Sequence, residues 1–140
     1  MKVFLIITAL FTALGCATQK PAIQVQRETK ATLGELPEST DAVKINKASI
    51  SGNIMTLEVT YTGGCKEHRF ELIGREMISK SLPPIRSVKL VHTGNGDDCT
   101  TTITHPVKFD IRDLAYKQEA GSEIMLKVEG VEDRLLYSFE

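Results

Sequence analysis

The chain has 140 residues, with 17 lysines and arginines against 18 aspartates and glutamates. The basic residues are scattered and are not interleaved with aromatic residues, which argues against a nucleic-acid-binding surface. The sequence also lacks nucleophile elbows, HExxH motifs and phosphate-binding glycine loops, so it indicates neither an enzyme nor a bound cofactor.

The first sixteen residues have the pattern of an export signal. Lys2 is followed by an uncharged, mostly apolar stretch over residues 3–14, which is too short to span a bilayer as a helix, and Cys16 follows after one glycine. This pattern resembles the bacterial lipobox, with Ala13 at the position that usually holds leucine. The resemblance implies a signal peptide over residues 1–15 and acylation of Cys16, which becomes the first mature residue.

The residues after Cys16 predict how the protein is held in the cell envelope. No later apolar run is long enough to cross a membrane, so anchoring rests on the lipid. Ala17 replaces the aspartate that retains enterobacterial lipoproteins in the inner membrane, which favours the outer membrane, facing the periplasm. Residues 17–42 are rich in Gln, Thr, Glu, Lys and Pro and lack a sustained period. With Cys16 they predict a lipidated cysteine and flexible tether over residues 16–42.

From Val43 onward, apolar and polar residues alternate, which is the period of a half-buried strand. The alternating segments lie at residues 43–50, 55–61, 69–72, 87–90, 99–111, 124–128 and 135–139. Residues 51–53 predict a hairpin between the first two segments, and residues 112–118 predict a helical turn. Pro106 lacks a backbone donor, so the strand that contains it should bend or lie at an edge there.

These segments predict the fold class of residues 43–140. Seven or eight short strands without a long helical pattern are typical of an all-β, antiparallel, Ig-like β-sandwich. A small barrel is the second choice.

Cys65 and Cys99 are the two cysteines that remain after lipidation of Cys16. In an exported protein, such a pair predicts a disulfide. On the chain-entropy model, closing a loop of this length stabilises the fold by roughly 3 to 4 kcal/mol.

Two histidines offer an alternative role for the same cysteines. The alternation places His68 and His92 on the apolar faces of their strands. If these strands are antiparallel neighbours, the two rings meet near Cys65 and Cys99, and this donor set suits zinc or copper. His105 lies roughly 20 Å farther along its strand and would be left out. The disulfide is the preferred interpretation, because bridged sulfurs do not bind zinc.

The segment Gly94-Asn95-Gly96-Asp97-Asp98 predicts a tight turn, since Gly and Asn tolerate positive φ and Asp side chains cap turns. A calcium site at its oxygen ligands is the alternative.

The pattern GGC-x-x-H-x-F-x-L, which begins at Gly63, is followed by N-G-D-x-C ending at Cys99. In this pattern the chain resembles a group of small, mostly uncharacterised bacterial lipoproteins. The resemblance implies a secreted domain whose cysteines and glycine turns form one unit, and it implies no activity.

Together these observations predict a lipid-anchored, non-enzymatic binding or structural module of the bacterial envelope. Its partner would be an envelope component or a protein, such as a protease or hydrolase that it inhibits, bound at a sheet face or strand edge. The alternative is a periplasmic metal-binding domain that uses His68 and His92. The oligomeric state stays open.

Overall fold

The computed structural model describes residues 28–140, so the predicted signal peptide, Cys16 and the first part of the predicted tether lie outside the described residues. The elements of the described chain are β1 (Thr29–Lys30), β2 (Thr32–Gly34), β3 (Lys44–Ser51), β4 (Ile54–Gly63), β5 (Arg69–Arg75), β6 (Ile85–Thr93), β7 (Thr101–Asp110), the 3-10 turn η1 (Arg112–Leu114), β8 (Glu123–Val128) and β9 (Leu135–Ser138). Over residues 28–140, no helix has the length and apolar character needed to cross a membrane.

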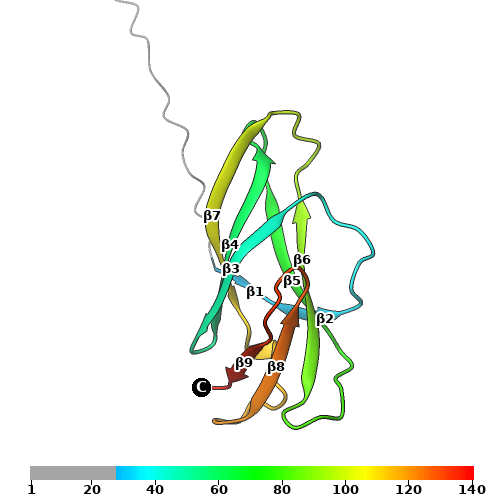
Figure 1. Ribbon diagram of the computed structural model, residues 1–140, viewed down its shortest axis with the longest axis vertical. Helices are drawn as coiled ribbons and strands as arrows, with labels where there is room; N and C mark the ends of the chain where they lie inside the picture. Colours follow the sequence, from blue (N-terminus) through cyan, green and yellow to red (C-terminus); the bar gives the residue numbers. More distant parts are fainter. Residues whose placement is uncertain (1–27) are drawn as a thin grey trace, which may run out of the picture.

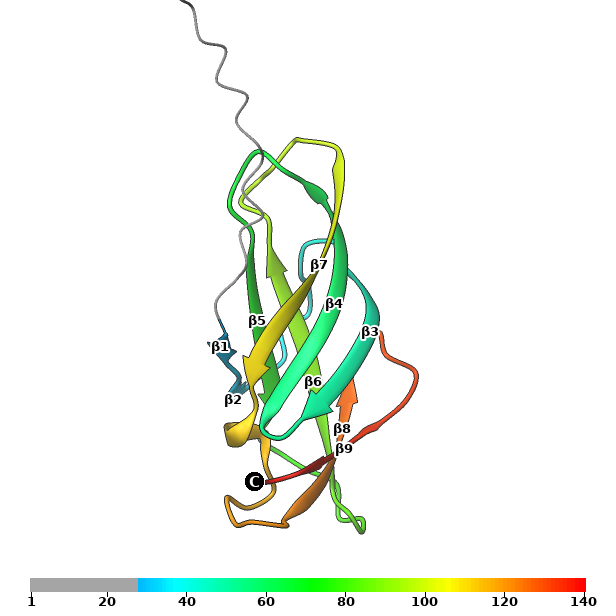
Figure 2. The same ribbon diagram turned by 90° about the vertical axis from the view of Figure 1, so that its left-hand side faces the viewer.

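The strands form two sheets that pack face to face (Figure 1). One sheet has the order β1-β7-β4-β3, and the other has the order β2-β5-β6-β8-β9. Figure 2 shows the first sheet in front of the second. The predicted all-β sandwich is confirmed, and the sheets do not close into a barrel.

The sheets are mixed, whereas the expected sandwich was antiparallel throughout. The pairs β1–β7, β2–β5 and β6–β8 are parallel. In each case the chain crosses to the opposite sheet before it returns, and such a crossover allows two strands of one sheet to run in the same direction. The alternation in the sequence marks strands but carries no information about these crossovers.

The core follows the alternation of the strands. In β4, Met55, Leu57 and Val59 are fully buried while Glu58 is exposed. Removing these side chains from water stabilises the sandwich by about 1.5 to 3 kcal/mol for each large apolar residue.

The predicted domain boundary at Val43 is wrong, because much of the predicted tether belongs to the sandwich. β1 and β2 each join a different sheet, and Ala31 between them is fully buried with its amide bonded to the Asp110 carbonyl at 2.8 Å. Farther on, the Thr40 hydroxyl accepts a hydrogen bond from the His92 amide at 2.6 Å. Strands of two and three residues are too short to show an alternation of apolar and polar residues, so the sequence of this segment does not reveal them.

The local turn predictions are confirmed with one change. The hairpin between β3 and β4 turns at Gly52, whose φ is 56°. β1 pairs with β7 only at Phe109 and Asp110, so Pro106 lies where the outer side of β7 has no partner strand within residues 28–140. The helical turn expected over residues 112–118 is limited to η1.

Candidate functional site

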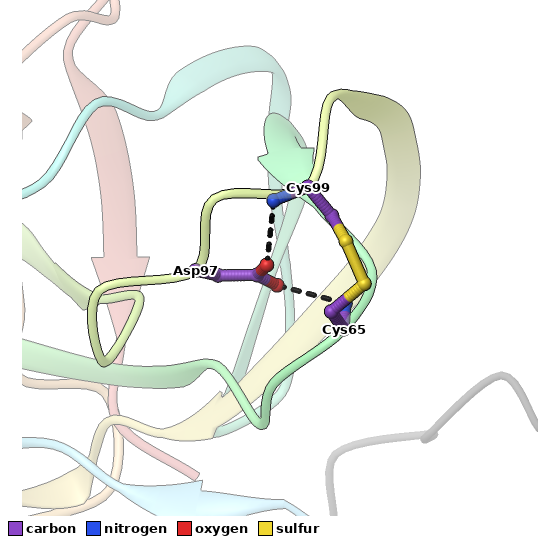
Figure 3. A group of neighbouring side chains, drawn as sticks. All are labelled: Cys65, Asp97 and Cys99. Atoms are coloured by element: carbon purple, nitrogen blue, oxygen red, sulfur yellow. Dashed lines mark hydrogen bonds between the residues drawn. A yellow bond between two sulfur atoms is a disulfide. The ribbon is translucent and has the colours of Figure 1, made fainter.

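A disulfide joins two loops at one end of the sandwich (Figure 3). Cys65 follows β4 and Cys99 precedes β7, and their Cα atoms are 5.8 Å apart. The predicted pairing of these cysteines is therefore present in the structure, and it links segments 34 residues apart in the chain.

The carboxylate of Asp97 lies between the two bridged cysteines (Figure 3). Its Oδ2 accepts hydrogen bonds from three successive backbone amides, those of Gly64, Cys65 and Lys66, at 2.8, 2.9 and 3.0 Å. Its Oδ1 accepts one from the Cys99 amide at 2.9 Å. Successive amides that converge on one oxygen form an anion-binding nest, so this side chain fixes both cysteine loops.

Lys66, which lies in the other cysteine loop, also holds the turn that carries Asp97. The Lys66 ammonium donates to the carbonyls of Asn95 and Gly96 at 3.1 and 2.7 Å. Asn95 and Gly96 have φ angles of 54° and 64°, which is the left-handed conformation that a tight turn requires. The predicted turn is confirmed. The calcium alternative does not fit, because both carboxylate oxygens of Asp97 already accept backbone hydrogen bonds.

Two histidines extend the hydrogen bonds of Asp97 into the sandwich. His68 Nε2 lies 3.0 Å from Asp97 Oδ2, and His68 Nδ1 lies 2.8 Å from His92 Nε2. His92 Nδ1 lies 3.0 Å from the carbonyl oxygen of Ala42. The predicted meeting of the two rings is confirmed. We call Asp97, His68, His92 and the Ala42 carbonyl the Asp-His-His chain.

The acceptors at its two ends orient the Asp-His-His chain. The Ala42 carbonyl and the ionised Asp97 carboxylate can only accept, so His92 Nδ1 and His68 Nε2 carry the protons that face them. The two rings then meet through His68 Nδ1 and His92 Nε2.

Burial and hydrogen bonding shift the protonation of these groups. The hydrogen bond from His68 and those from backbone amides hold the pKa of Asp97 well below its usual range. Burial lowers the pKa of His92, although its bond to the Ala42 carbonyl opposes this shift. Burial and the nearby Asp97 charge raise the pKa of Tyr61. Asp97 is therefore ionised, and the charged form of His92 is disfavoured.

We expect His92 to make the fold sensitive to mild acid. Its pKa is lowered in the folded state, so the unfolded chain binds more protons, with a pKa of about 6.5. The contribution of neutral His92 is complete above about pH 6.5 and is lost as the pH falls toward the folded-state pKa. Urea unfolding between pH 7.5 and 5.5 should show a steeper loss of stability in the wild type than in His92→Gln. Equal slopes for the two proteins would contradict the expectation.

Aromatic rings surround the histidine pair. Phe70 stacks on His92 with the ring centroids 4.7 Å apart and the planes 7° apart. The Tyr61 ring lies 4.5 Å from His68 and 5.6 Å from His105. As predicted, His105 stays outside the hydrogen bonds of the histidine pair, but it shares their aromatic group. The separation of roughly 20 Å expected along the strand did not include the neighbouring strand β4, where Tyr61 contacts the rings of both His68 and His105.

Gly63 packs directly against the Asp-His-His chain. A Cβ atom at this position would lie within 3 Å of both His68 Nε2 and Asp97 Oδ2. We therefore expect Gly63→Ala to push the His68 ring away from the carboxylate and to destabilise the fold by about 1 to 3 kcal/mol. Thermal unfolding measures the loss, and Gly34→Ala is the control, because Gly34 has no positive φ and an added Cβ there would meet only the Ile73 Cγ2 at an ordinary 3.9 Å. An equal effect of the two substitutions would contradict the steric explanation.

The metal site that was the alternative to the disulfide does not fit the donor atoms. The sulfurs of Cys65 and Cys99 and the carboxylate of Asp97 lie within 4.8 Å of one another, but the sulfurs share a bond and are not thiolates. All four ring nitrogens of His68 and His92 have hydrogen-bond partners. The four-ligand alternative is therefore wrong for the disulfide-bonded protein.

A cleft of about 400 Å³ opens beside the Asp-His-His chain, with Tyr61, His68, His92 and Asp41 among its lining residues. The histidine nitrogens are bonded to one another, to Asp97 and to a carbonyl, rather than to a hydroxyl or thiol that they could activate. Asp41 is likewise occupied, since its Oδ2 accepts from the Gly94 amide at 2.7 Å. These hydrogen bonds hold both histidine rings and the Asp41 carboxylate in place at this end of the sandwich.

The fold and this cluster define a small, disulfide-linked β-sandwich in which the clustered titratable side chains are hydrogen-bonded to one another and to the backbone. The chain belongs to the family described as the NigD-like C-terminal beta sandwich domain, which matches residues 23–139.

Two solved structures have a similar fold. A Bacteroides vulgatus protein of unknown function (DUF1344) is 17% identical with a TM-score of 0.55, and the match covers 81% of this chain and 57% of that one. A NigD-like immunity protein from Bacteroides caccae is 14% identical with a TM-score of 0.55, covering 80% of this chain and 60% of that one. The chain thus spans less than two thirds of either protein, and at these identities the likeness concerns the fold. No curated protein matches the sequence.

Proposed function

We propose that the chain is a non-enzymatic binding module of immunity type, which binds a harmful protein at the bacterial envelope and neutralises it. The observation that carries this proposal is membership of the NigD-like family, together with the shared fold of a solved NigD-like immunity protein. The geometry supports it, because the titratable cluster is occupied by internal hydrogen bonds and leaves protein binding as the use of the exposed surface. The bound protein is a toxin, or a protease or hydrolase that acts on the envelope.

The protective role is tested in the bacterium that makes the protein. A strain without the gene should be killed by secreted proteins of sister strains at doses that the parent survives, and the full-length chain should restore survival. Equal survival of the deletion strain and its parent across these secreted fractions would reject the immunity role.

We further propose that, after removal of residues 1–15, a lipid on Cys16 holds the module in the outer membrane, facing the periplasm. This position rests on the lipobox pattern of the N-terminal sequence. An anchored module meets an incoming protein before that protein reaches its target.

We expect Cys16→Ser to abolish membrane attachment, because the chain then has no residue to acylate and the apolar stretch of residues 3–14 is too short to span the bilayer. The wild type should incorporate labelled palmitate and sediment with membranes, whereas the variant should do neither. Ala17→Ser is the control and should behave as the wild type. Membrane association of the Cys16 variant would show that another feature holds the protein.

A further inference from the structure

The loop between β5 and β6 lies at the end of the sandwich opposite to the disulfide (Figure 1). It presents apolar side chains to solvent: Leu82 is 100% exposed and Met77 is 76% exposed. Tyr116, which follows η1, is 48% exposed and lines the same groove as Leu82. Large apolar side chains exposed together mark binding surfaces more often than single ones do.

The loop that carries Leu82 is held in one conformation by its own hydrogen bonds. The Ser79 amide donates to the Ile85 carbonyl at 3.0 Å, and the Ile85 amide donates to the Ser79 hydroxyl at 3.1 Å. The Ser81 hydroxyl donates to the Pro83 carbonyl at 3.0 Å and lies 2.8 Å from the Ser79 hydroxyl. Leu82 at the tip is thus exposed on an ordered loop, which reduces the entropy lost on binding.

A buried arginine fixes this loop to the neighbouring turn. Arg86 is only 5% exposed, and its guanidinium donates to carbonyls of residues 75–76 on one side and residues 114–115 on the other. These carbonyls lie at the base of the loop and directly before Tyr116. The guanidinium therefore sets the positions of Leu82 and Tyr116 relative to one another.

The groove between these elements has a volume of about 360 Å³ and an apolar lining that includes Ile78, Leu82, Pro84 and Tyr116. Lys80 is the charged residue of its lining. A second cation stands nearby, with the Lys117 ammonium 5.7 Å from the centre of the Tyr116 ring.

The charge of the groove is available to a partner. Within residues 28–140, neither Lys80 nor Lys117 forms an ion pair with a carboxylate. The complementary ligand therefore combines an apolar side chain with a nearby carboxylate.

We propose that this groove is the docking surface for the protein partner, and that it receives an apolar side chain of that partner flanked by an acidic residue. The inference rests on the proposed function in that it takes the partner to be a protein. Leu82 and Tyr116 are the apolar anchors, and Lys80 and Lys117 select the acidic flank.

The test uses the full-length exported chain and a random peptide library displayed on phage as the probe. Enriched peptides should pair Leu, Phe or Trp with Asp or Glu. Their affinity should fall roughly tenfold or more in Leu82→Ser. It should fall roughly threefold in Lys80→Glu, as expected for an exposed ion pair. Leu136→Ser is the matched control, since Leu136 is 52% exposed on β9, and affinity should change less than about twofold there.

Three outcomes would overturn the docking surface. These are enrichment of peptides without acidic residues, unchanged affinity in Leu82→Ser, and a concentration-dependent dimer that Leu82→Ser dissociates, which would make a second copy the occupant. Thermal unfolding checks that each variant is folded, as expected for exposed positions.

The survival assay separates this inference from the proposed function. If the deletion strain is sensitive and Leu82→Ser protects it as well as the wild type does, the immunity role stands and the surface is wrong. If the deletion strain is not sensitive, the immunity role is wrong. The peptide affinities then still test whether the groove is a docking surface.

Discussion

Replacing Cys65 and Cys99 together by serine is expected to lower the free energy of unfolding by about 3 to 4 kcal/mol. The bridge joins residues 34 positions apart, so its loss releases a long loop in the unfolded chain. The melting temperature should fall by roughly 15 °C, given the usual unfolding entropy of a domain of this size. Thermal and urea unfolding of the double variant measure the change.

A reductant provides the control for this variant. The wild type in excess dithiothreitol should lose about as much stability as the double serine variant, and the variant itself should not respond. The backbone amides of both positions, rather than the sulfurs, bind Asp97. The folded variant should therefore retain the Asp-His-His chain, visible as unchanged histidine resonances. Equal stability of variant and wild type would show that the bridge constrains little.

Replacing Arg86 by methionine is expected to cost about 3 kcal/mol, which makes it the second large effect. Methionine fills a similar volume but leaves the carbonyls of residues 75–76 and 114–115 without their donor. Burial of unpaired carbonyls is costly, and the guanidinium cannot be replaced by an apolar side chain here. Urea unfolding measures the loss.

Arg69→Met is the matched control, because Arg69 is an exposed arginine of β5. Its stability should stay within about 0.5 kcal/mol of the wild type. Hydrogen exchange should also speed up at residues 76–84 and 115–117 in Arg86→Met, since both segments lose their common support. Wild-type stability and exchange in Arg86→Met would show that water replaces the guanidinium.

The local sequence predicts the positions of some of the site residues but not of others. His68 and His92 were expected to meet, because both share an apolar face and their strands pair antiparallel, with Phe70 opposite His92. Arg86 has the same parity as Val88 and His92, so the alternation also predicts that its side chain points inward. Asp97 offered no such signal, since a loop has no period.

Sequence alone determined the properties that depend on neighbours along the chain. The period of two in segments such as Met55 to Tyr61 identifies strands, because alternate side chains face opposite sides of a sheet. Two cysteines left over in a chain with the sequence pattern of an export signal predict a disulfide. Glycines mark turns because they lack a Cβ atom.

Only the tertiary structure decided the contacts between residues that are far apart in the chain. It brought β1 and β2 into different sheets, paired three sets of strands in parallel and bonded the Asp97 carboxylate to loops from two regions of the chain. It also joined the loop of Leu82 to Tyr116 through Arg86. These contacts arise from crossovers between the sheets and from hydrogen bonds to backbone carbonyls and amides. Every residue type offers such backbone groups, so the sequence does not distinguish the ones that are used.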